Sequence, residues 1–166
     1  MKRLILMRHA KSDWSSGAAS DHDRPLNTRG RRSAAALGDF LRDNDLLPDQ
    51  VLCSSAERTG ETLLRLKLPE GVDVTFTRDL YLATHNDILR ALQKATGQTV
   101  LIVGHNPGMG ITASEILTAP PAEAPQFDKY PTGATLVADF EIEDWSQADW
   151  GNANARHFVV PRDLES

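Results

Sequence analysis

The chain has 166 residues, of which 23 are acidic and 18 are basic, giving a formal net charge of −5. This length predicts a single domain over residues 1–166, large enough to bury a core without disulfide bonds or a structural metal. The acidic balance argues against a nucleic-acid partner, so any anion site must be a local pocket of Arg and His side chains. The single cysteine, Cys53, excludes an intramolecular disulfide bond and suits a reducing compartment.

The first residues do not have the pattern of a signal peptide. Only four apolar residues, Leu4 to Met7, separate the basic start from Arg8, too few for the hydrophobic region of a signal. No later stretch approaches membrane-spanning length. We therefore expect a cytoplasmic protein without a membrane partner.

The same apolar run predicts a strand over about 3–7 that is buried on both faces, because its apolar residues do not alternate with polar ones. Arg8 and His9 follow at once, so a cation and an imidazole stand where the strand ends. Ligands of open α/β sheets bind in the crevice outside the carboxyl ends of the strands. The chain therefore begins with a candidate active-site edge.

A polar loop and a helix follow this strand. Residues 11–23 are polar, with Gly and Ser, and predict a loop that could fold over the strand end. Thr28 is the expected N-cap of a helix that continues to about Asn44. The apolar residues of this helix recur at spacings of three and four and form one core-facing stripe: Ala34, Leu37, Phe40 and Leu41.

The middle of the chain alternates strand and helix patterns. Strands are predicted over 51–53, 72–76 and 99–103, and helices after residue 55, over 86–95 and over 108–117. Ser54 or Ser55 can cap the first of these helices, which places Arg58 in its first or second turn. Asn106 as N-cap, with Pro107 at the first helical position, would start the last. His105 thus stands at a strand end, as His9 does.

The C-terminal part adds two strands. Residues 119–125 form a Pro-rich loop, too short to link two domains, and a strand is predicted over 134–140. A polar turn over 141–154, containing Trp145 and Trp150, leads to a last strand over 156–160, for which an antiparallel direction stays open. The alternation predicts an α/β fold of three layers, α/β/α, with a mainly parallel central sheet covered by helices on both faces.

Three strand ends carry candidate chemistry: Arg8–His9, Arg58 and His105. Each has an ordinary explanation by itself, because a lone His is more often a structural residue and an Arg near a helix start is usually a solvated charge. Their shared placement after successive strands favours a common pocket.

Several motifs resemble the histidine phosphatase superfamily, which includes cofactor-dependent phosphoglycerate mutases and acid phosphatases. Residues 6–14 (LMRHAKSDW) are similar to its Arg-His-Gly or Arg-His-Ala signature. Further motifs are residues 23–30 (DRPLNTRG), 54–62 (SSAERTGET), 104–108 (GHNPG) and 131–134 (PTGA). Their order resembles that of the small phosphohistidine phosphatases of the SixA type, over residues 1 to about 140.

This resemblance implies the histidine phosphatase (phosphoglycerate mutase-like) fold and makes His9 the nucleophile, which forms a phosphohistidine intermediate that water hydrolyses. An imidazole attacks only through a neutral nitrogen, and the cations Arg8 and Arg58 disfavour a proton on His9. Together with His105 they would hold the charge on the phosphoryl oxygens. The scheme requires no metal and no other cofactor.

Four residues after the nucleophile are candidates for substrate binding. Lys11, Ser12 and Trp14 could rim the phosphate pocket, with a surface loop and one packed Trp as the equal alternative. Ser15 stands where mutase-like members often have Asn, which leaves a shorter hydrogen-bonding side chain.

A departure from the superfamily pattern bears on the substrate. Many members that cleave phosphate esters carry a Glu shortly after a Leu-Tyr pair, and this Glu protonates the departing alkoxide. Here Leu80-Tyr81 is followed by Leu82-Ala83, and Asp79 precedes the pair. An alkoxide leaves badly without a proton, whereas a phosphorylated imidazole can leave as a neutral ring. The missing acid therefore favours a P–N substrate.

The sequence thus predicts a metal-independent phosphatase acting on phosphohistidine, with a phosphotransfer protein as substrate. One alternative is a phosphomonoesterase of small phosphorylated substrates, using Asp79 or another acid, and a second is a phosphate-binding module without turnover. A metallophosphatase with ligands from Asp21-His22-Asp23 and around His105 is a third, which chelator-resistant activity would eliminate. The oligomeric state is not predicted.

Other features receive structural explanations. Asp23 and Arg24 are expected to form an ion pair that fixes the loop, and Cys53 to be a core residue. His22, His85 and His157 lack motif contexts and are expected to be surface or structural residues. Residues 108–113 (GMGITA) match the spacing of a dinucleotide fingerprint. Residues 105–107 intervene and no strand follows, so nucleotide binding is rejected.

Overall fold

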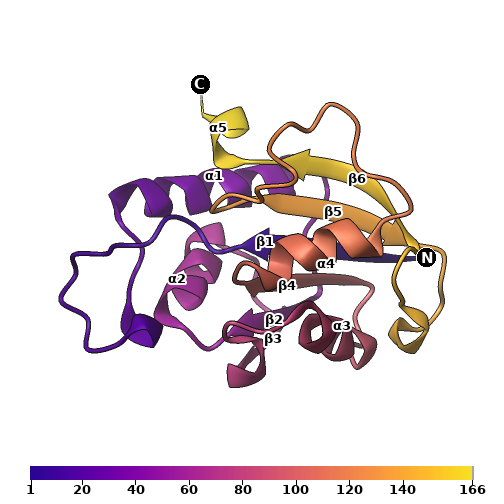
Figure 1. Ribbon diagram of the computed structural model, residues 1–166, viewed down its shortest axis with the longest axis horizontal. Coiled ribbons are helices and arrows are strands. Elements are labelled where there is room, and N and C mark those ends of the chain that lie inside the picture. The colour runs from indigo at the N-terminus through magenta and orange to yellow at the C-terminus, as the bar shows by residue number, and fades with distance from the viewer. Residues whose placement is uncertain (166) are drawn as a thin grey trace.

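The unbroken apolar run near the N-terminus forms strand β1 (Lys2–Arg8), in which Leu4 to Met7 are fully buried. In the computed structural model, which describes residues 1–165, this strand lies inside a six-stranded sheet (Figure 1). The other strands are β2 (Gln50–Ser54), β3 (Asp73–Thr77), β4 (Thr99–Gly104), β5 (Thr135–Phe140) and β6 (Ala153–Val159). Their order across the sheet is β3-β2-β4-β1-β5-β6.

The sheet is mainly parallel, as predicted. Strands β1 to β4 pair in parallel, whereas β5 is antiparallel to both of its neighbours, β1 and β6. In the register, Arg8 lies opposite Gly104, and Cys53 lies opposite Val103. The carboxyl ends of β1, β2 and β4 therefore meet at one edge, on the left of Figure 1.

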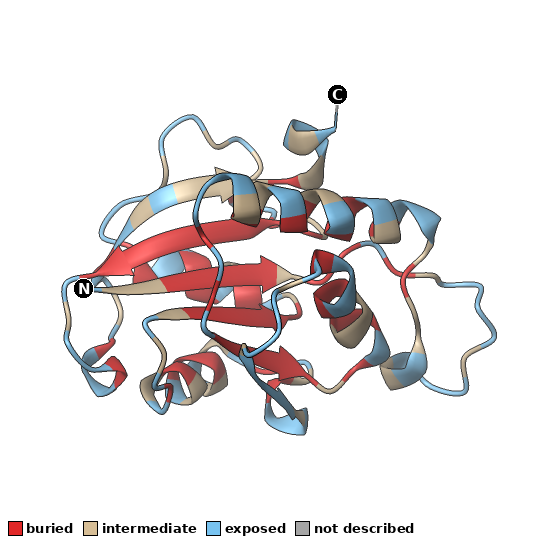
Figure 2. Cartoon of the chain, turned by 180° about the vertical axis from the view of Figure 1, so that it is seen from behind, coloured by how far each residue is buried: buried red, intermediate tan, exposed pale blue. Residues whose placement is uncertain are grey.

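Helices cover both faces of the sheet. Helices α1 (Thr28–Asp43), α2 (Glu57–Leu66) and α5 (Pro161–Leu164) pack on the face of Ile5 and Met7. Helices α3 (His85–Gln93) and α4 (Gly108–Ile116) pack on the face of Leu4 and Leu6. The central strands are buried between these layers (Figure 2), so the predicted three-layer α/β/α fold is confirmed. Among residues 1–165, no helix combines the length and the apolar character needed to cross a membrane.

The start of α1 differs from the prediction by one residue. The N-cap is Asn27 in place of Thr28, because the Asn27 side chain accepts the Gly30 backbone N–H at 2.8 Å. Farther along α1, Phe40 is only partly buried and meets the His157 ring edge-on, so the apolar stripe is narrower than predicted.

The predicted caps of α2 and α4 are wrong, because none of Ser54, Ser55 and Asn106 is the residue directly before its helix. Ala56 precedes α2, and the Ser54 hydroxyl contacts His105. Pro107 precedes α4, so it is not the first helical residue; the Asn106 side chain accepts the Gly110 N–H from farther along the helix.

Residues 141–154 form more than a polar turn. Short 3-10 helices occur at Asp21–Asp23, Arg78–Leu80 and Trp145–Gln147. In the last of these, Trp145 is buried against Phe140 and donates its ring N–H to the Gly97 carbonyl at 2.6 Å. Strand β6 then begins at Ala153, earlier than predicted, and its pairing with β5 is antiparallel.

Candidate active site

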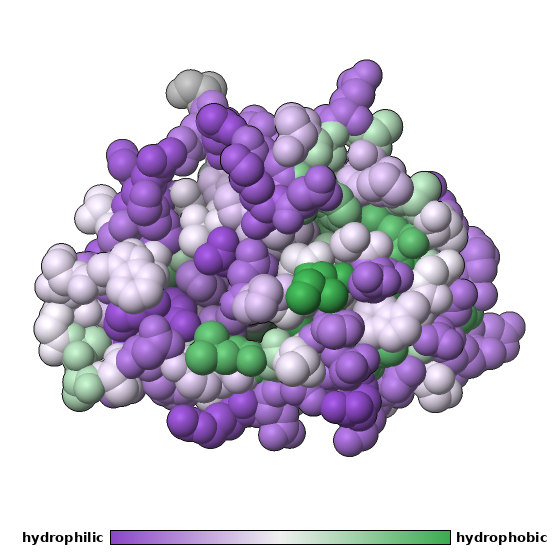
Figure 3. All heavy atoms as spheres, in the orientation of Figure 1, coloured by the Kyte–Doolittle hydropathy of each residue, from purple (hydrophilic) through white to green (hydrophobic). Residues whose placement is uncertain are grey.

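Three parallel strands end beside one cavity of about 540 Å³. His9 follows β1, Arg58 lies in the first turn of α2 directly after β2, and His105 follows β4. The shared sheet edge thus brings these three residues and Arg8 together, as their placement in the sequence predicts. Mostly hydrophilic side chains cover α1 and surround the end of β1, whereas hydrophobic ones form separate patches (Figure 3).

The ring of His9 is held in one tautomer. Its Nδ1 lies 2.7 Å from the Ala10 carbonyl oxygen, and because a carbonyl only accepts, Nδ1 carries the proton and Nε2 keeps a lone pair. Burial lowers the pKa of His9 to about 3, and the positive charges of Arg8 and Arg58 act in the same direction. His9 therefore presents a neutral Nε2.

His105 lies beside this ring, with 5.4 Å between the two ring centroids. Its Nε2 is 2.8 Å from the Ser54 hydroxyl, and its Nδ1 is buried with no hydrogen-bond partner within residues 1–165. Burial, followed by the charge of Arg58, lowers the pKa of His105 to about 3.

The Ser54 contact is compatible with a His105 tautomer that presents an N–H at Nδ1. The Ser54 oxygen accepts the Ala56 backbone N–H at 3.3 Å, so its own hydrogen can be donated to Nε2 of His105. In that arrangement Nδ1 of the neutral ring carries its single N–H hydrogen. A buried N–H without an acceptor is costly, and a phosphoryl oxygen would satisfy it.

Two guanidinium groups complete the core of the site. Arg58 is only 3% exposed and donates to the Asp21 backbone oxygen at 2.8 Å and to the Asp21 carboxylate at 3.0 Å. Arg8 donates to the Tyr130 carbonyl at 3.2 Å, and burial together with the Arg58 charge lowers its pKa. Within the described chain, the buried Nε of each Arg has no hydrogen-bond partner. Both residues keep donors for an oxyanion.

Asp21 lines the cavity, although the sequence assigned it only to a possible metal site. The Tyr81 hydroxyl, Arg24 and Arg58 donate to its carboxylate, and these hydrogen bonds hold the pKa of Asp21 well below its usual range. The predicted Asp23–Arg24 ion pair is wrong. The 3-10 turn brings Asp21 to Arg24, whereas Asp23 accepts from Ser20.

The four candidate substrate-binding residues after His9 separate into two groups. Lys11, Ser12 and Trp14 line the cavity, whereas Ser15 lies outside it and donates to Asp13 at 3.0 Å. The Arg24 guanidinium donates to Ser12 at 2.8 Å and stacks 3.6 Å from the centre of the exposed Trp14 ring. Arg24 therefore positions the side chains of Ser12 and Trp14 at the edge of the cavity.

Further lining residues were not assigned from the sequence. Asn106, Pro131 and Thr132 line the cavity, and the motifs that contain them could have indicated this. Leu82 also lines it, from a left-handed backbone conformation with φ of 50°, for which the sequence holds no signal. Asp79 lines a different hollow, beside Asp87 and Arg90 on α3.

The remaining histidines and the cysteine have structural neighbours. His22 bonds to Ser55 at 2.9 Å, and the rings of His85 and His157 pack against Trp150 and Phe40. Cys53 is buried in β2, and burial raises the pKa of its thiol to about 12. Over residues 1–165, no three His, Cys, Asp or Glu side chains gather in a way that could hold a metal ion.

A family model described as the histidine phosphatase superfamily (branch 1) matches residues 4–81. The phosphohistidine phosphatase SixA of Escherichia coli is 30% identical over 131 residues, which cover 74% of this chain and 77% of that protein. The chain belongs to the histidine phosphatase superfamily. The family predicted from the motifs is thus confirmed, and the activity that follows is that of a phosphatase.

Other relatives of this histidine phosphatase match nearly its whole length. An uncharacterized protein of Mycobacterium tuberculosis is 35% identical over 164 residues, covering 94% of this chain and 100% of that protein. A solved structure from Agrobacterium tumefaciens, provisionally named a SixA phosphohistidine phosphatase, is 27% identical with a TM-score of 0.82, covering 96% of this chain and 98% of its own. A similarly named structure from Nakamurella multipartitia is 29% identical with a TM-score of 0.80 and covers 96% of each chain.

Proposed function

We propose that this histidine phosphatase hydrolyses the P–N bond of phosphohistidine on a phosphotransfer protein, through a covalent phosphohistidine on His9. The observation that carries the proposal is the pairing of a neutral His9 Nε2 with three candidate oxyanion donors in a cavity where, among residues 1–165, the one lining carboxylate, Asp21, is held in its charged form. The name of the SixA relative, a phosphohistidine phosphatase, agrees with it. The proposal takes residues 1–166 as one catalytic domain and requires no metal.

In the first step, Nε2 of His9 attacks phosphorus in line with the substrate nitrogen. A P–Nε2 bond forms, the substrate P–N bond breaks, and its electron pair stays on the departing imidazole, which leaves neutral when its other nitrogen carries a proton. The forks of Arg8 and Arg58 and the Nδ1–H of His105 hold the phosphoryl oxygens, which stabilises the spread charge of the transition state.

In the second step, water attacks the phosphoryl group on His9. A P–O bond forms, the P–Nε2 bond breaks, and inorganic phosphate leaves with the oxygen of water, while the surplus proton passes to phosphate or to solvent. The Ala10 carbonyl keeps the proton of His9 on Nδ1 throughout, so Nε2 returns ready for the next cycle.

The preference for a P–N bond follows from the carboxylates around the cavity. Asp21 is the one carboxylate that lines it within residues 1–165, and three donors keep its charged form. Asp79, the acid considered for an esterase, lines another hollow. Because an alkoxide needs a proton to leave, phosphate esters should be poor substrates.

The test compares a phosphohistidine peptide with a panel of phosphate esters. Wild type should hydrolyse the peptide far faster than the esters, and His9→Ala should abolish the activity. His85→Ala, a His substitution outside the cavity, is the control and should retain it. Faster turnover of the esters would overturn the substrate class, and binding of both without turnover would favour the phosphate-binding module.

A further inference from the structure

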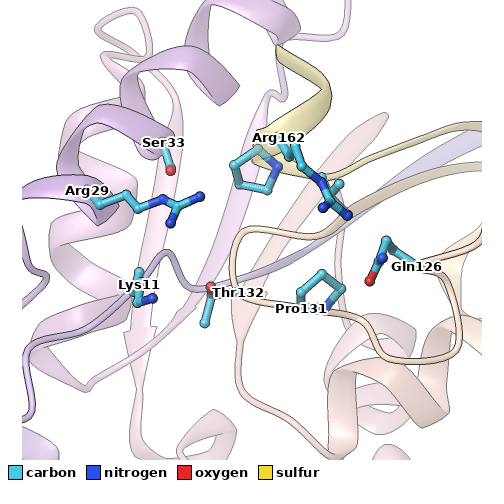
Figure 4. A pocket seen from close by; sticks show the side chains of 9 residues that line it. Lys11, Arg29, Ser33, Gln126, Pro131, Thr132 and Arg162 are labelled. Carbon is cyan, nitrogen blue, oxygen red and sulfur yellow. The ribbon is translucent and has the colours of Figure 1, made fainter. Parts of the chain in front are cut away.

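A second pocket adjoins the catalytic cavity. It encloses about 210 Å³ between the loop after β1, the first turns of α1 and the C-terminal segment. Figure 4 shows Arg29 extending from α1 into the pocket, Lys11 below it, and Arg162 on the facing side. Three cations from separate parts of the chain thus meet around a space large enough for a carboxylate or a phosphate group.

The two walls of this pocket are set by close backbone approaches. A Cβ at Gly30 would overlap the Lys11 carbonyl oxygen, so only glycine lets α1 lie against the loop after the nucleophile. A Cβ at Gly133 would lie 2.5 Å from the Pro161 ring, and Gly133 has a φ of 77°. Gly133 also donates its N–H to the His9 carbonyl at 2.9 Å, so the C-terminal wall is tied to the nucleophile.

The charges around the pocket have no internal counterpart. Within residues 1–165, none of Lys11, Arg29 and Arg162 forms an ion pair, although the chain as a whole is acidic. The pocket also shares Lys11, Pro131 and Thr132 with the catalytic cavity. A molecule whose phosphoryl group lies at His9 can therefore extend into it.

We propose that this pocket binds a second anionic group of the substrate, a carboxylate or a phosphate, while the first phosphoryl group lies at His9. The inference rests on the proposed function and adds a recognition element to it. Clustered cations attract an oxyanion and hold it by charge-assisted hydrogen bonds. The group can be an acidic side chain near the phosphohistidine of a protein or the carboxylate of a small phosphorylated molecule.

The experiment measures kcat/KM on matched substrate pairs that differ in one anionic group. The protein arm uses phosphohistidine peptides with Glu or with Gln beside the phosphohistidine, and the small-molecule arm uses phosphohistidine or its carboxamide. The variant R29Q/R162Q removes both cations that line only the second pocket. Arg32→Gln, at an exposed position of α1 outside the lining, is the control and removes one positive charge away from the pocket, against two in the double variant.

Wild type and Arg32→Gln should prefer the anionic member of a pair, and R29Q/R162Q should lose this preference through a drop of about tenfold in kcat/KM for that member alone. If the preference is lost in the peptide arm, the substrate is an acidic protein. If it is lost in the small-molecule arm, the substrate is a small acidic molecule. An unchanged preference, or an equal drop for both members, would overturn the inference.

A third pair, phosphoglycerate and glycerol phosphate, separates the two proposals. If the P–N substrates are not hydrolysed but this ester pair shows a preference that R29Q/R162Q abolishes, the second pocket stands and the proposed substrate class fails. If the P–N substrates are hydrolysed without any preference, the proposed function stands and the pocket inference fails.

Discussion

The two histidines of the site are neutral for the same reason: each ring is buried among cations. Burial holds the pKa of His9 and of His105 at about 3, against an ordinary value of 6.5. The Ala10 carbonyl fixes the proton of His9 on Nδ1, and the Ser54 hydroxyl can donate to Nε2 of His105, which is the arrangement that the proposed mechanism uses. One nitrogen of the pair is a lone-pair donor and the other a hydrogen-bond donor.

This neutrality has a cost in stability at acid pH. Between pH 6.5 and about 3 the unfolded chain binds protons that the folded chain excludes, so the free energy of unfolding falls as the pH is lowered through this window. Each ring should contribute a loss of about 1 kcal/mol between about pH 7.5 and 5.5. Urea unfolding should show this slope in wild type and a flatter one in H9N/H105N. An identical slope in both proteins would contradict the buried neutral state.

Ser54 is predicted to act as a positioning residue through His105. Ser54→Ala removes the hydroxyl that fixes Nε2, so kcat should fall about tenfold or more while KM changes little. The acid limb of the pH–kcat profile of this variant should also move, because the His105 ring loses a hydrogen-bond partner of its neutral form. Ser55→Ala, which removes a contact to His22, is the control. Equal effects of the two substitutions on kcat and on the pH profile would refute the assignment.

At the scale of single residues, the sequence identifies those candidate site residues that directly follow a strand. Arg8, His9 and His105 stand at the ends of apolar runs, and the position of Arg58 follows from the strand before it. Asp21 could not be assigned in the same way, because its contact with Arg58 depends on the path of a loop between them. Such contacts are set by tertiary packing, which local patterns do not encode.

At the scale of elements, one glycine, Gly30, lets α1 lie against the loop that follows His9. Gly30→Ala should destabilise the fold by more than about 2 kcal/mol and lower kcat/KM, because the added methyl group overlaps the Lys11 backbone. Gly60→Ala in α2 meets its nearest neighbour, Phe76, only at 3.8 Å, and should stabilise the fold by about 0.5–1 kcal/mol. Thermal and urea unfolding check both values; a Gly30→Ala protein as stable as wild type would show that α1 can shift away.

The strands and helices are predictable from periodicity, since the buried strands are continuous apolar runs and α1 carries a helical stripe. The residues at which these strands and helices begin and end are less predictable. Ser54 and Asn106 have the chemistry of helix caps, yet Ser54 contacts His105, and Asn106 also donates to the Tyr130 carbonyl besides accepting the Gly110 N–H of α4. Trp145 stands in a polar stretch and is nevertheless buried, because its ring N–H reaches a carbonyl across the fold.

At the scale of the whole molecule, the sheet gathers cations at one edge of an acidic protein. Arg8, Arg58 and His105 should supply all of the transition-state stabilisation that a metal gives in other phosphatases. Activity should therefore survive prolonged EDTA treatment, and added Mg²⁺ should not raise kcat. Loss of activity in EDTA and its recovery with a divalent ion would favour the metallophosphatase.

The covalent step on His9 is the central claim. Acid-labile, alkali-stable phosphate should be found by mass spectrometry on the His9 peptide after the wild-type reaction with a phosphohistidine peptide is rapidly quenched under alkaline conditions. The label should be absent from His9→Ala and present in His85→Ala. Phosphate trapped on another residue of the wild-type protein would contradict His9 as the nucleophile.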